Sequence, residues 1–397
     1  MHVGIDVSLL LYPAVAGMRL YLVALLEALL AEGPQHRWGL FYHTRRSWGG
    51  VGEIERFAAA NVHLVPAPAP VRMVPDSAWW LGFDPPLRWM TRERFDVFHA
   101  GDFLFPRSPT TPMVATLFDL TPELFPELHV APNRVRHRRQ MAWAARRASR
   151  LIAISQATAD DFGRLFPSPV PIDVIHPGTR RLPSADSVSA DAIAAIRTRL
   201  GVGSDRLVLC VGTVEPRKNT ARLIEAFGRV ALDPAHPAAD VRLVLAGRRG
   251  WRSEAAYRAA AASPIAGRIH FAEDVEDVEL AALYATAEVF AYPSLYEGFG
   301  LPVVEAMQAG LPVLTSTVSS LPEAAGGAAV LVDPADTDAI ARGLADLLSD
   351  ANLRARLSAA GRGHARTLTW ASAARRTLRT YRLAAQSRRR PPSAERP

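Results

Sequence analysis

The stretch from Tyr292 to Glu305, YPSLYEGFGLPVVE, combines two carboxylates with a glycine turn. An apolar run before the turn predicts a buried strand, and an apolar helix follows, with Pro302 in a first turn that tolerates proline. The amino end of such a helix offers backbone N–H groups and a partial positive charge, which together hold phosphate. Glu297 precedes the helix and Glu305 lies within it, so each can contact a different part of a nucleotide-sugar.

A second polar cluster, GTVEPRKN at 212–219, follows the apolar run RLVLCVG. Arg217 and Lys218 stand at the head of the next helical pattern, where cations oppose the helix dipole. An anion bound between them would compensate that cost, and a diphosphate suits both an arginine fork and a lysine point charge. The alternative is a solvated basic turn.

Alternating apolar runs and helical patterns predict an α/β fold with parallel sheets. Ligands bind beyond the carboxyl ends of strands in such sheets. Three further candidates stand after expected strands or in the first loop, namely Gly17, His99 and Asp119. A structural histidine and a helix or turn cap are the alternatives for His99 and Asp119.

Two Rossmann-like halves are expected, joined by a linker rich in Pro, Ser, Asp and Gly that holds a short Ala-rich helix. The final helix is expected to return to the first half, and the Pro-rich, charged tail to be disordered. The expected parts are residues 1–183, the linker 184–205, the second domain 206–366, the returning helix 367–386 and the tail 387–397.

The block EGFGLPVVEAMQAGLPVL resembles the Glu, seven residues, Glu motif of family 4 retaining glycosyltransferases, and GTVEPRKN resembles their donor-phosphate turn. The resemblance covers the chain from Gly4 to about Asp333. It implies a GT-B fold, that is, two Rossmann-like doubly wound parallel-sheet domains facing a cleft. The implied acceptor site lies mainly in the first domain and the donor site mainly in the second.

By position in these motifs, the resemblance implies that Glu305 binds the donor ribose and that Glu297 faces the reacting sugar carbon. The donor diphosphate or sugar hydroxyls would meet the turn that carries Gly298, Phe299, Gly300 and Leu301. Gly17 would let the first loop approach the diphosphate closely. His99 and Asp119 would contact sugar hydroxyls near the reaction.

The sequence departs from the family's common pattern in four places. Thr213 stands where many relatives have a cation, Ala16 precedes Gly17 in place of a glycine pair, Gly101 replaces a second histidine, and Phe118 precedes Asp119. The family's favoured reaction is a front-face transfer with retention, in which the leaving diphosphate takes the acceptor proton. No bound metal or other cofactor is expected besides the nucleotide-diphosphate sugar as co-substrate.

Composition limits the remaining choices. One cysteine, Cys210, excludes a disulfide framework and favours a reducing, cytoplasmic compartment. No run of about eighteen apolar residues predicts a membrane span. The formal net charge of +7 favours anionic partners, but no nucleic-acid-binding module is recognisable.

The acceptor side is expected to involve the membrane. A basic stretch from Arg134 to Arg150 contains Met141 and Trp143, which is typical of helices that lie on anionic membranes. The run from Trp79 to Met90 is rich in aromatic residues. We expect peripheral association with the inner face of the plasma membrane and a glycan or lipid-linked acceptor, with a solvated basic face as the alternative.

The sequence therefore favours a hexosyltransferase, with GDP-mannose as the first donor to test. A sugar-nucleotide epimerase or hydrolase on the same scaffold is the main alternative, and a nucleotide-sugar binder without catalysis is another. The nucleotide base, the sugar, the linkage and the oligomeric state stay open.

Overall fold

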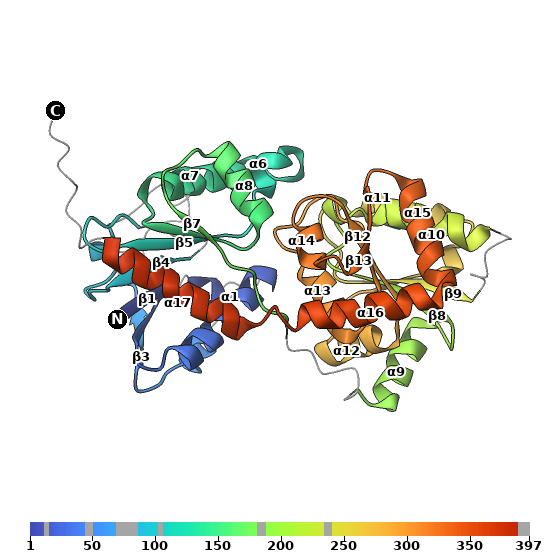
Figure 1. Ribbon diagram of the computed structural model, residues 1–397, viewed down its shortest axis with the longest axis horizontal. Coiled ribbons are helices and arrows are strands. Elements are labelled where there is room, and N and C mark those ends of the chain that lie inside the picture. Colours follow the sequence, from blue (N-terminus) through green and yellow to red (C-terminus); the bar gives the residue numbers. More distant parts are fainter. Residues whose placement is uncertain are drawn as a thin grey trace. The chain divides into compact units, whose positions relative to one another are not determined.

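The chain forms two compact units in the computed structural model (Figure 1). The first unit comprises Met1–Gly178 and Trp370–Pro397, and the second comprises Thr179–Thr369. The structure describes residues 1–11, 16–43, 51–68, 86–101, 106–180, 188–233 and 240–387.

The first unit is built on a seven-stranded parallel sheet with the order β3-β2-β1-β4-β5-β6-β7. Its strands are β1 His2–Asp6, β2 Arg37–Tyr42, β3 Val62–Pro66, β4 Val97–Ala100, β5 Met113–Leu117, β6 Arg150–Ala153 and β7 Ile172–Val174. Its helices are η1 Ser8–Leu11, α1 Ala16–Glu32, α2 Gly52–Glu55, α5 Leu87–Met90, α6 Thr121–Leu124, η2 Pro126–Leu128, α7 Ala131–Arg147, α8 Gln156–Leu165 and α17 Trp370–Ser387.

The second unit is built on a six-stranded parallel sheet with the order β10-β9-β8-β11-β12-β13. Its strands are β8 Arg206–Val211, β9 Val241–Ala246, β10 Ile269–Ala272, β11 Val289–Tyr292, β12 Val313–Ser316 and β13 Ala329–Val332. Its helices are α9 Ala190–Leu200, η4 Pro216–Lys218, α10 Thr220–Leu232, α11 Glu254–Ala262, η5 Ala266–Arg268, α12 Asp277–Thr286, α13 Leu301–Ala309, α14 Leu321–Ala325, α15 Thr337–Ser349 and α16 Ala351–Ala365.

Both sheets are built from short apolar runs of sequence whose burial stabilises the fold. Strand β11 is buried at all four positions, and the inner strands β8 and β9 are buried over most of their length. Strands covered on both faces read as continuous apolar runs, as parallel sheets require. Each run that the sequence predicts to be a strand forms one, which confirms the predicted α/β class.

Two glycines open space on one face of the first sheet. Gly4 of β1 lies opposite Gly39 of β2 in the register. A Cβ at Gly4 would approach the Phe95 ring to 2.8 Å, and a Cβ at Gly39 would approach it to 2.6 Å. Phe95 therefore fills the volume that two side chains would otherwise take. Through this ring the segment before β4 packs against β1 and β2.

The element boundaries differ from the expected ones at the linker. The expected linker 184–205 contains α9, and α9 packs against α12 as part of the second unit. The chain passes between the units at Gly178–Thr179 and again at Thr369–Trp370. Residues 388–397, most of the expected tail, lie outside the described part of the chain.

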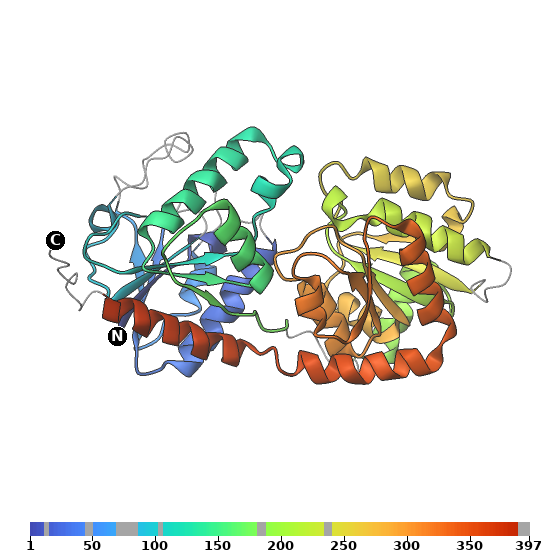
Figure 2. The same ribbon diagram turned by 45° about the horizontal axis from the view of Figure 1, so that its top comes forward.

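Helix α17 packs on the first unit, where it contacts α1, β4, β5 and β6 (Figures 1 and 2). Its buried side chains recur every three or four residues, as on one face of a helix; they are Ala373, Ala374, Thr377, Leu378, Thr380, Tyr381 and Ala384. Gly178 lies against the start of this helix, because a Cβ there would come within 2.3 Å of the Trp370 backbone nitrogen.

We expect Gly178→Ala to lower the free energy of unfolding of the first unit by about 1–3 kcal/mol, because backbone must move to admit the methyl group. Calorimetric unfolding of the full chain measures it. Gly163→Ala in α8 is the matched control, since a Cβ there meets nothing within 4 Å and alanine favours a helix by about 1 kcal/mol. Equal unfolding temperatures for the two variants would contradict this packing.

Candidate functional site

The site in the second unit begins where β8 ends. After β8 the chain makes the short helix η4, which carries Arg217 and Lys218. Asn219 follows in the left-handed conformation at φ 60°. Its side-chain amide donates to the carbonyls of Pro293 at 2.9 Å and Pro334 at 2.7 Å. Asn219 therefore fixes the two cations at the carboxyl end of the sheet, beside the loop that follows β11.

The glycine turn after β11 leads into α13 as the sequence predicts. Gly300 is the N-cap at φ 98°, and a Cβ there would lie 2.7 Å from Leu321 Cδ2. Glycine is needed here for both reasons. Gly298 and the buried Phe299 precede it, and Leu301 is the first residue of α13. The turn thus places a helix amino end, which favours anions, next to Glu297.

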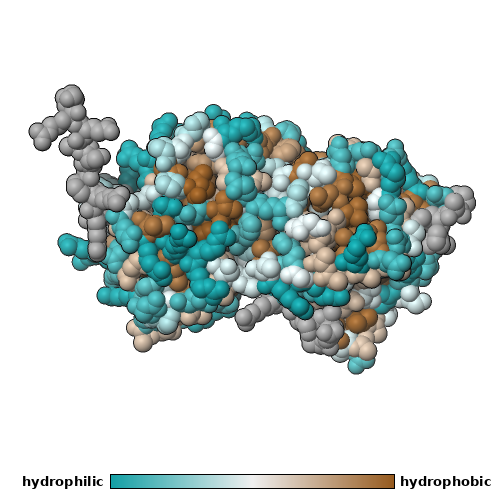
Figure 3. All heavy atoms as spheres, in the orientation of Figure 1, coloured by the Kyte–Doolittle hydropathy of each residue, from teal (hydrophilic) through white to brown (hydrophobic). Residues whose placement is uncertain are grey.

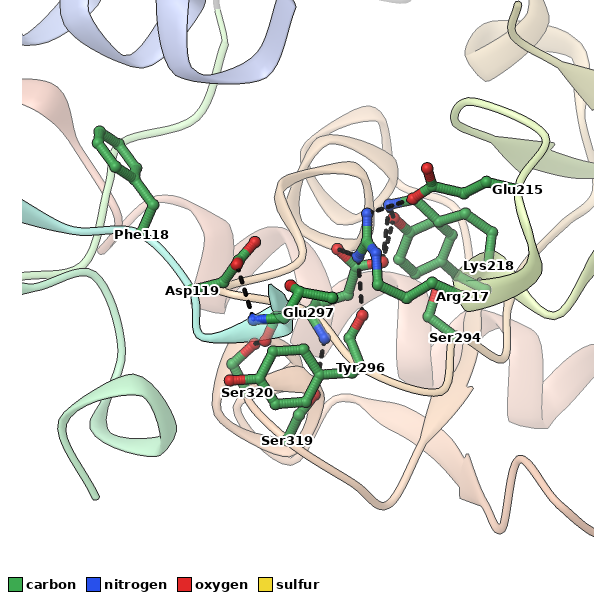
Figure 4. A network of polar contacts seen from close by, with 12 residues as sticks. Phe118, Asp119, Glu215, Arg217, Lys218, Ser294, Tyr296, Glu297, Ser319 and Ser320 are labelled. Atoms are coloured by element: carbon green, nitrogen blue, oxygen red, sulfur yellow. Dashed lines mark hydrogen bonds and ion pairs between the residues drawn. The ribbon is translucent and has the colours of Figure 1, made fainter. Parts of the chain in front are cut away.

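Glu297 lies between the two cations (Figure 4). Its Oε2 is 2.8 Å from Arg217 Nη1, and its Oε1 accepts from Lys218 Nζ at 2.7 Å. The Tyr292 hydroxyl also donates to Oε1, at 2.9 Å. The carboxylate is 9% exposed. The structure thus brings together three of the residues that the sequence singles out and adds Tyr292 as a fourth.

Backbone contacts hold Glu297 in this position. Its N–H donates to Ser319 Oγ at 3.0 Å, and its carbonyl accepts from Ser320 Oγ at 2.8 Å. Arg217 donates to the Tyr296 carbonyl at 2.8 Å and to Glu215 at 2.6 Å. The loop after β12 and the turn after β8 therefore support the glutamate from two sides.

The charges of this cluster decide its chemistry. Burial alone would raise the pKa of Glu297, but Arg217 and Lys218 outweigh burial and lower it to about 2. Burial lowers the pKa of Lys218, and the charge of Glu297 offsets part of that effect. Glu297 is therefore a fixed carboxylate at neutral pH, which suits stabilisation of positive charge and not donation of a proton.

Sequence reasoning missed Tyr292 and Glu215 as members of this cluster. Both lie inside the stretches that it singled out, one at the end of β11 and the other two residues before Arg217. Their proximity to the motif was the only available signal, because the bonds they make depend on how the two loops fold together.

Glu305 lies on α13 in a different environment from Glu297. It is buried, and one of its oxygens accepts from the Tyr284 hydroxyl at 3.1 Å. Burial raises its pKa, and Tyr284 and Arg180 counter this only in part. A carboxylate that accepts from a hydroxyl here could accept from ribose hydroxyls, so the predicted role of Glu305 stays a prediction compatible with its position.

In the first unit, His99 is a buried member of the sheet. Its Nδ1 lies 2.6 Å from the Tyr381 hydroxyl and its Nε2 lies 2.8 Å from Thr116 Oγ1. Burial lowers the pKa of His99 to about 4. The ring is therefore neutral at pH 7 and ties α17 to the sheet, which favours the structural interpretation over the predicted catalytic one. His99 also lines a small pocket with Asp6 and Phe118.

Asp119 and Gly17 take positions with local explanations. Asp119 Oδ1 accepts from the Thr121 backbone N–H at 3.0 Å, so it caps the turn before α6. Gly17 lies in the first turn of α1, whereas the sequence placed it in a loop. Among the described residues, a Cβ at Gly17 would meet no atom within 4 Å outside its own helix backbone. The predicted roles of both residues at the reacting sugar or the diphosphate stay predictions.

The basic stretch forms α7, except that Arg150 is the first residue of β6, and its Met141 and Trp143 do not face solvent. Met141 and Trp143 belong to the core of the first unit, and Arg150 pairs with Asp173 at 2.8 Å. Val130 and Val135 at its amino end are exposed. The exposed arginines of the stretch are Arg134, Arg138, Arg139, Arg146 and Arg147. Apart from Trp89, which is exposed, and Met90, which is buried, residues 79–90 lie mostly outside the described part of the chain.

Across the described residues, no helix combines the length and apolar character that crossing a bilayer requires. On the face shown in Figure 3, apolar areas on each unit are broken up by hydrophilic residues. This face therefore carries no uniform apolar surface.

Two family models match this chain. Residues 193–364 match the model for glycosyl transferases group 1, and residues 15–180 match the model for Glycosyltransferase Family 4. The O-antigen chain mannosyltransferase B of Escherichia coli is 32% identical over 74% of this chain and 76% of its own length. A D-inositol 3-phosphate glycosyltransferase of Streptomyces scabiei is 35% identical over 62% of this chain, which spans 56% of that relative.

A solved structure of similar fold is that of HepE from Anabaena in complex with UDP and glucose. It matches with a TM-score of 0.67 and 18% identity over 96% of this chain and 99% of that one. The shared fold is GT-B, so the predicted pair of Rossmann-like parallel-sheet domains is confirmed. Taken with the sequence matches, these findings identify the chain as a member of the family 4 glycosyltransferases with mannosyltransferase-like relatives.

Proposed function

We propose that this glycosyltransferase moves a hexose from a nucleotide-diphosphate sugar to a hydroxyl of a glycan or lipid-linked acceptor, with retention at the reacting carbon and without a metal ion. The observation that carries the proposal is the buried carboxylate of Glu297, held by Arg217 and Lys218 next to the amino end of α13. Positive groups and a helix end are what a departing diphosphate requires.

The reaction follows from the charges. As the bond between the sugar carbon and the phosphate oxygen breaks, negative charge grows on the diphosphate and positive charge on the sugar carbon. The acceptor oxygen bonds to that carbon from the same face, and its proton passes to the leaving phosphate oxygen. Arg217 and Lys218 stabilise the leaving group, while ionised Glu297 stabilises the positive sugar carbon.

Lys218 can contact the Glu297 carboxylate and the donor diphosphate at the same time. An ammonium has three N–H donors, and two of them are directed at Glu297 and Tyr292. We assign the third to a phosphate oxygen. Arg217 is directed at Glu215, Tyr296 and Glu297, so its part in binding the diphosphate is mainly electrostatic.

GDP-mannose is the first donor that we propose. The similarity to an O-antigen chain mannosyltransferase supports mannose. UDP-glucose is the second candidate, because HepE of similar fold is seen with UDP-glucose. The glycan acceptor is proposed because the mannosyltransferase relative is named for an O-antigen chain.

The pKa of Glu297 argues against this residue as the general base that an epimerase or a hydrolase would need. A general base works best with a pKa near the working pH, and Glu297, with a pKa of about 2, is far from it. A nucleotide-sugar binder without catalysis would share the cation pair, so it is distinguished only by turnover.

We expect Glu297→Gln to lower kcat by about 10²-fold or more while binding of GDP stays the same or tightens, because the two cations lose their internal counterion. Lys218→Ala should weaken both GDP binding and turnover. Nucleotide release from a panel of GDP-, UDP-, ADP- and dTDP-sugars, with and without acceptor, measures turnover, and calorimetry measures nucleotide binding.

Glu225→Gln on the exposed face of α10 is the matched control. It removes one carboxylate of the same unit that pairs with Arg229 and does not belong to the Glu297 cluster. It should leave both measurements unchanged. Nucleotide release without acceptor and with an epimerised sugar would favour the alternative enzyme class, and full activity in Glu297→Gln would contradict the role assigned here. Product anomers by NMR test retention.

We expect no acid limb from Glu297 or His99 in the pH profile of kcat/KM between about pH 5.5 and 8. The pKa of Glu297 is lowered to about 2 and that of His99 to about 4. Each group gains a proton only as the pH falls toward those values, so both keep one charge state over the range. A limb near pH 6.5 that disappears in His99→Asn would contradict this.

We also propose that the exposed arginines of α7, together with Val130 and Val135, form a surface, the α7 face, that holds the enzyme on an anionic membrane. This membrane would carry the acceptor. The arginines of this face are exposed, and Val130 and Val135 stand beside them. Each basic residue near an anionic surface contributes about 1 kcal/mol. The affinity should therefore fall steeply when several are replaced.

The triple variant Arg138→Gln, Arg146→Gln, Arg147→Gln should lose most sedimentation with anionic vesicles at low salt. A triple variant that removes the same charge from exposed sites of the second unit is the control, namely Arg258→Gln, Arg342→Gln, Arg356→Gln. Equal loss in the two variants would show that only net charge matters, and no sedimentation of the wild-type chain would remove the proposal.

A further inference from the structure

Three potential metal ligands meet at the amino ends of the strands in the first unit. They are His2 of β1, His63 of β3 and Glu93 in the segment between α5 and β4. Glu93 Oε2 lies 3.5 Å from His63 Nε2 and 3.9 Å from His2 Nε2. All three ligand atoms lie within 4.8 Å of one another. No role in sugar transfer requires them.

The fold explains why two histidines from non-adjacent strands converge. Strand β2 separates β1 from β3, and Gly39 is the register partner of His63. The two imidazole centroids are 5.2 Å apart, and the His2 ring also lies 4.7 Å from the Phe95 ring. Phe95, which fills the space over Gly39, brings Glu93 to the same place.

The hydrogen bonding of His2 points to a cation. Its Nδ1 lies 2.8 Å from the Arg94 carbonyl, so in the neutral ring this nitrogen carries the proton and Nε2 presents a lone pair. The Nε2 atoms of His2 and His63 are both buried and have no hydrogen-bond partner. A lone pair that faces a carboxylate is unfavourable unless a positive ion lies between them. A histidine whose other nitrogen donates to a carbonyl is also the usual form of a metal ligand.

The distances fit one small ion. A tetrahedral zinc ion with ligands at about 2.0–2.1 Å separates neighbouring ligand atoms by about 3.3 Å. The observed separations from Glu93 Oε2 are 3.5 Å and 3.9 Å, and the two histidine nitrogens lie within 4.8 Å of each other, so the three ligands need only close slightly around an ion. We propose that His2, His63 and Glu93 bind one divalent transition-metal ion of the Zn²⁺ class, with solvent as the fourth ligand, and that the ion fastens β1, β3 and the Glu93 segment together.

Two neighbouring groups bear on the affinity. Arg37 Nη2 lies 4.0 Å from Glu93 Oε2 and is mostly exposed, so it competes weakly for the carboxylate. The Glu93 N–H donates to Thr91 Oγ1 at 3.0 Å, which fixes the backbone of the third ligand.

The test uses the full-length chain without a histidine tag, freed of metal by chelation and dialysis. Titration with Co²⁺ should give one equivalent with the visible absorption of a tetrahedral site, and Zn²⁺ should displace it. Zn²⁺ should also raise the unfolding temperature, because it binds the folded chain. His63→Ala and Glu93→Gln should each weaken Co²⁺ binding about tenfold or more and lose the tetrahedral spectrum.

His137→Ala is the matched control. His137 Nδ1 lies 3.6 Å from Glu123, so this pair resembles half of the proposed site, but no third ligand joins it among the described residues. Its removal should change neither the stoichiometry nor the spectrum. Octahedral or absent Co²⁺ absorption in the wild-type chain, or the same affinity in His63→Ala as in the wild type, would overturn the proposal. Either result would leave the transfer reaction untouched.

Discussion

The burial of one carboxylate between two cations is the interaction on which the second unit's site depends. Taking Glu297, Arg217 and Lys218 out of water is costly, and their mutual contacts at 2.7–2.8 Å compensate for much of it. Loss of Glu297 would remove the carboxylate that both cations share, and Arg217 would keep Glu215 as a carboxylate partner. The two loops that carry these residues must therefore close on each other in one arrangement.

The backbone meets this demand at a few special positions. Asn219 takes a left-handed conformation so that its amide can bond two carbonyls from other loops. Gly300 takes φ 98° at a point where a Cβ would strike Leu321. Both residues lie at the carboxyl ends of parallel strands, where helix amino ends gather and anions bind. The fold thus supplies the positive end of α13, and the loops supply the charges.

Local pattern was enough to predict the strands, the two halves and the motif residues, because each rests on neighbours in the chain. Apolar runs such as 207–211 predict buried strands, and EGFGLP predicts a turn into a helix. Contacts between residues that are far apart in the sequence could not be predicted from local pattern. Tyr292 with Lys218, His99 with Tyr381, and His2 with His63 depend on the order of the strands in each sheet and on where α17 packs. The burial of Met141 and Trp143 likewise depends on which face of α7 meets the sheet.

The two glutamates of the motif show how environment divides one residue type into two roles. Arg217 and Lys218 outweigh burial at Glu297, and its pKa falls to about 2. At Glu305 burial prevails over the hydroxyl of Tyr284 and the charge of Arg180, and its pKa rises. Groups whose pKa values are pushed apart in this way commonly divide the work of a site. Glu297 is therefore suited to a permanent charge and Glu305 to hydrogen bonds with uncharged hydroxyls, which is the division that the proposed nucleotide-sugar would require.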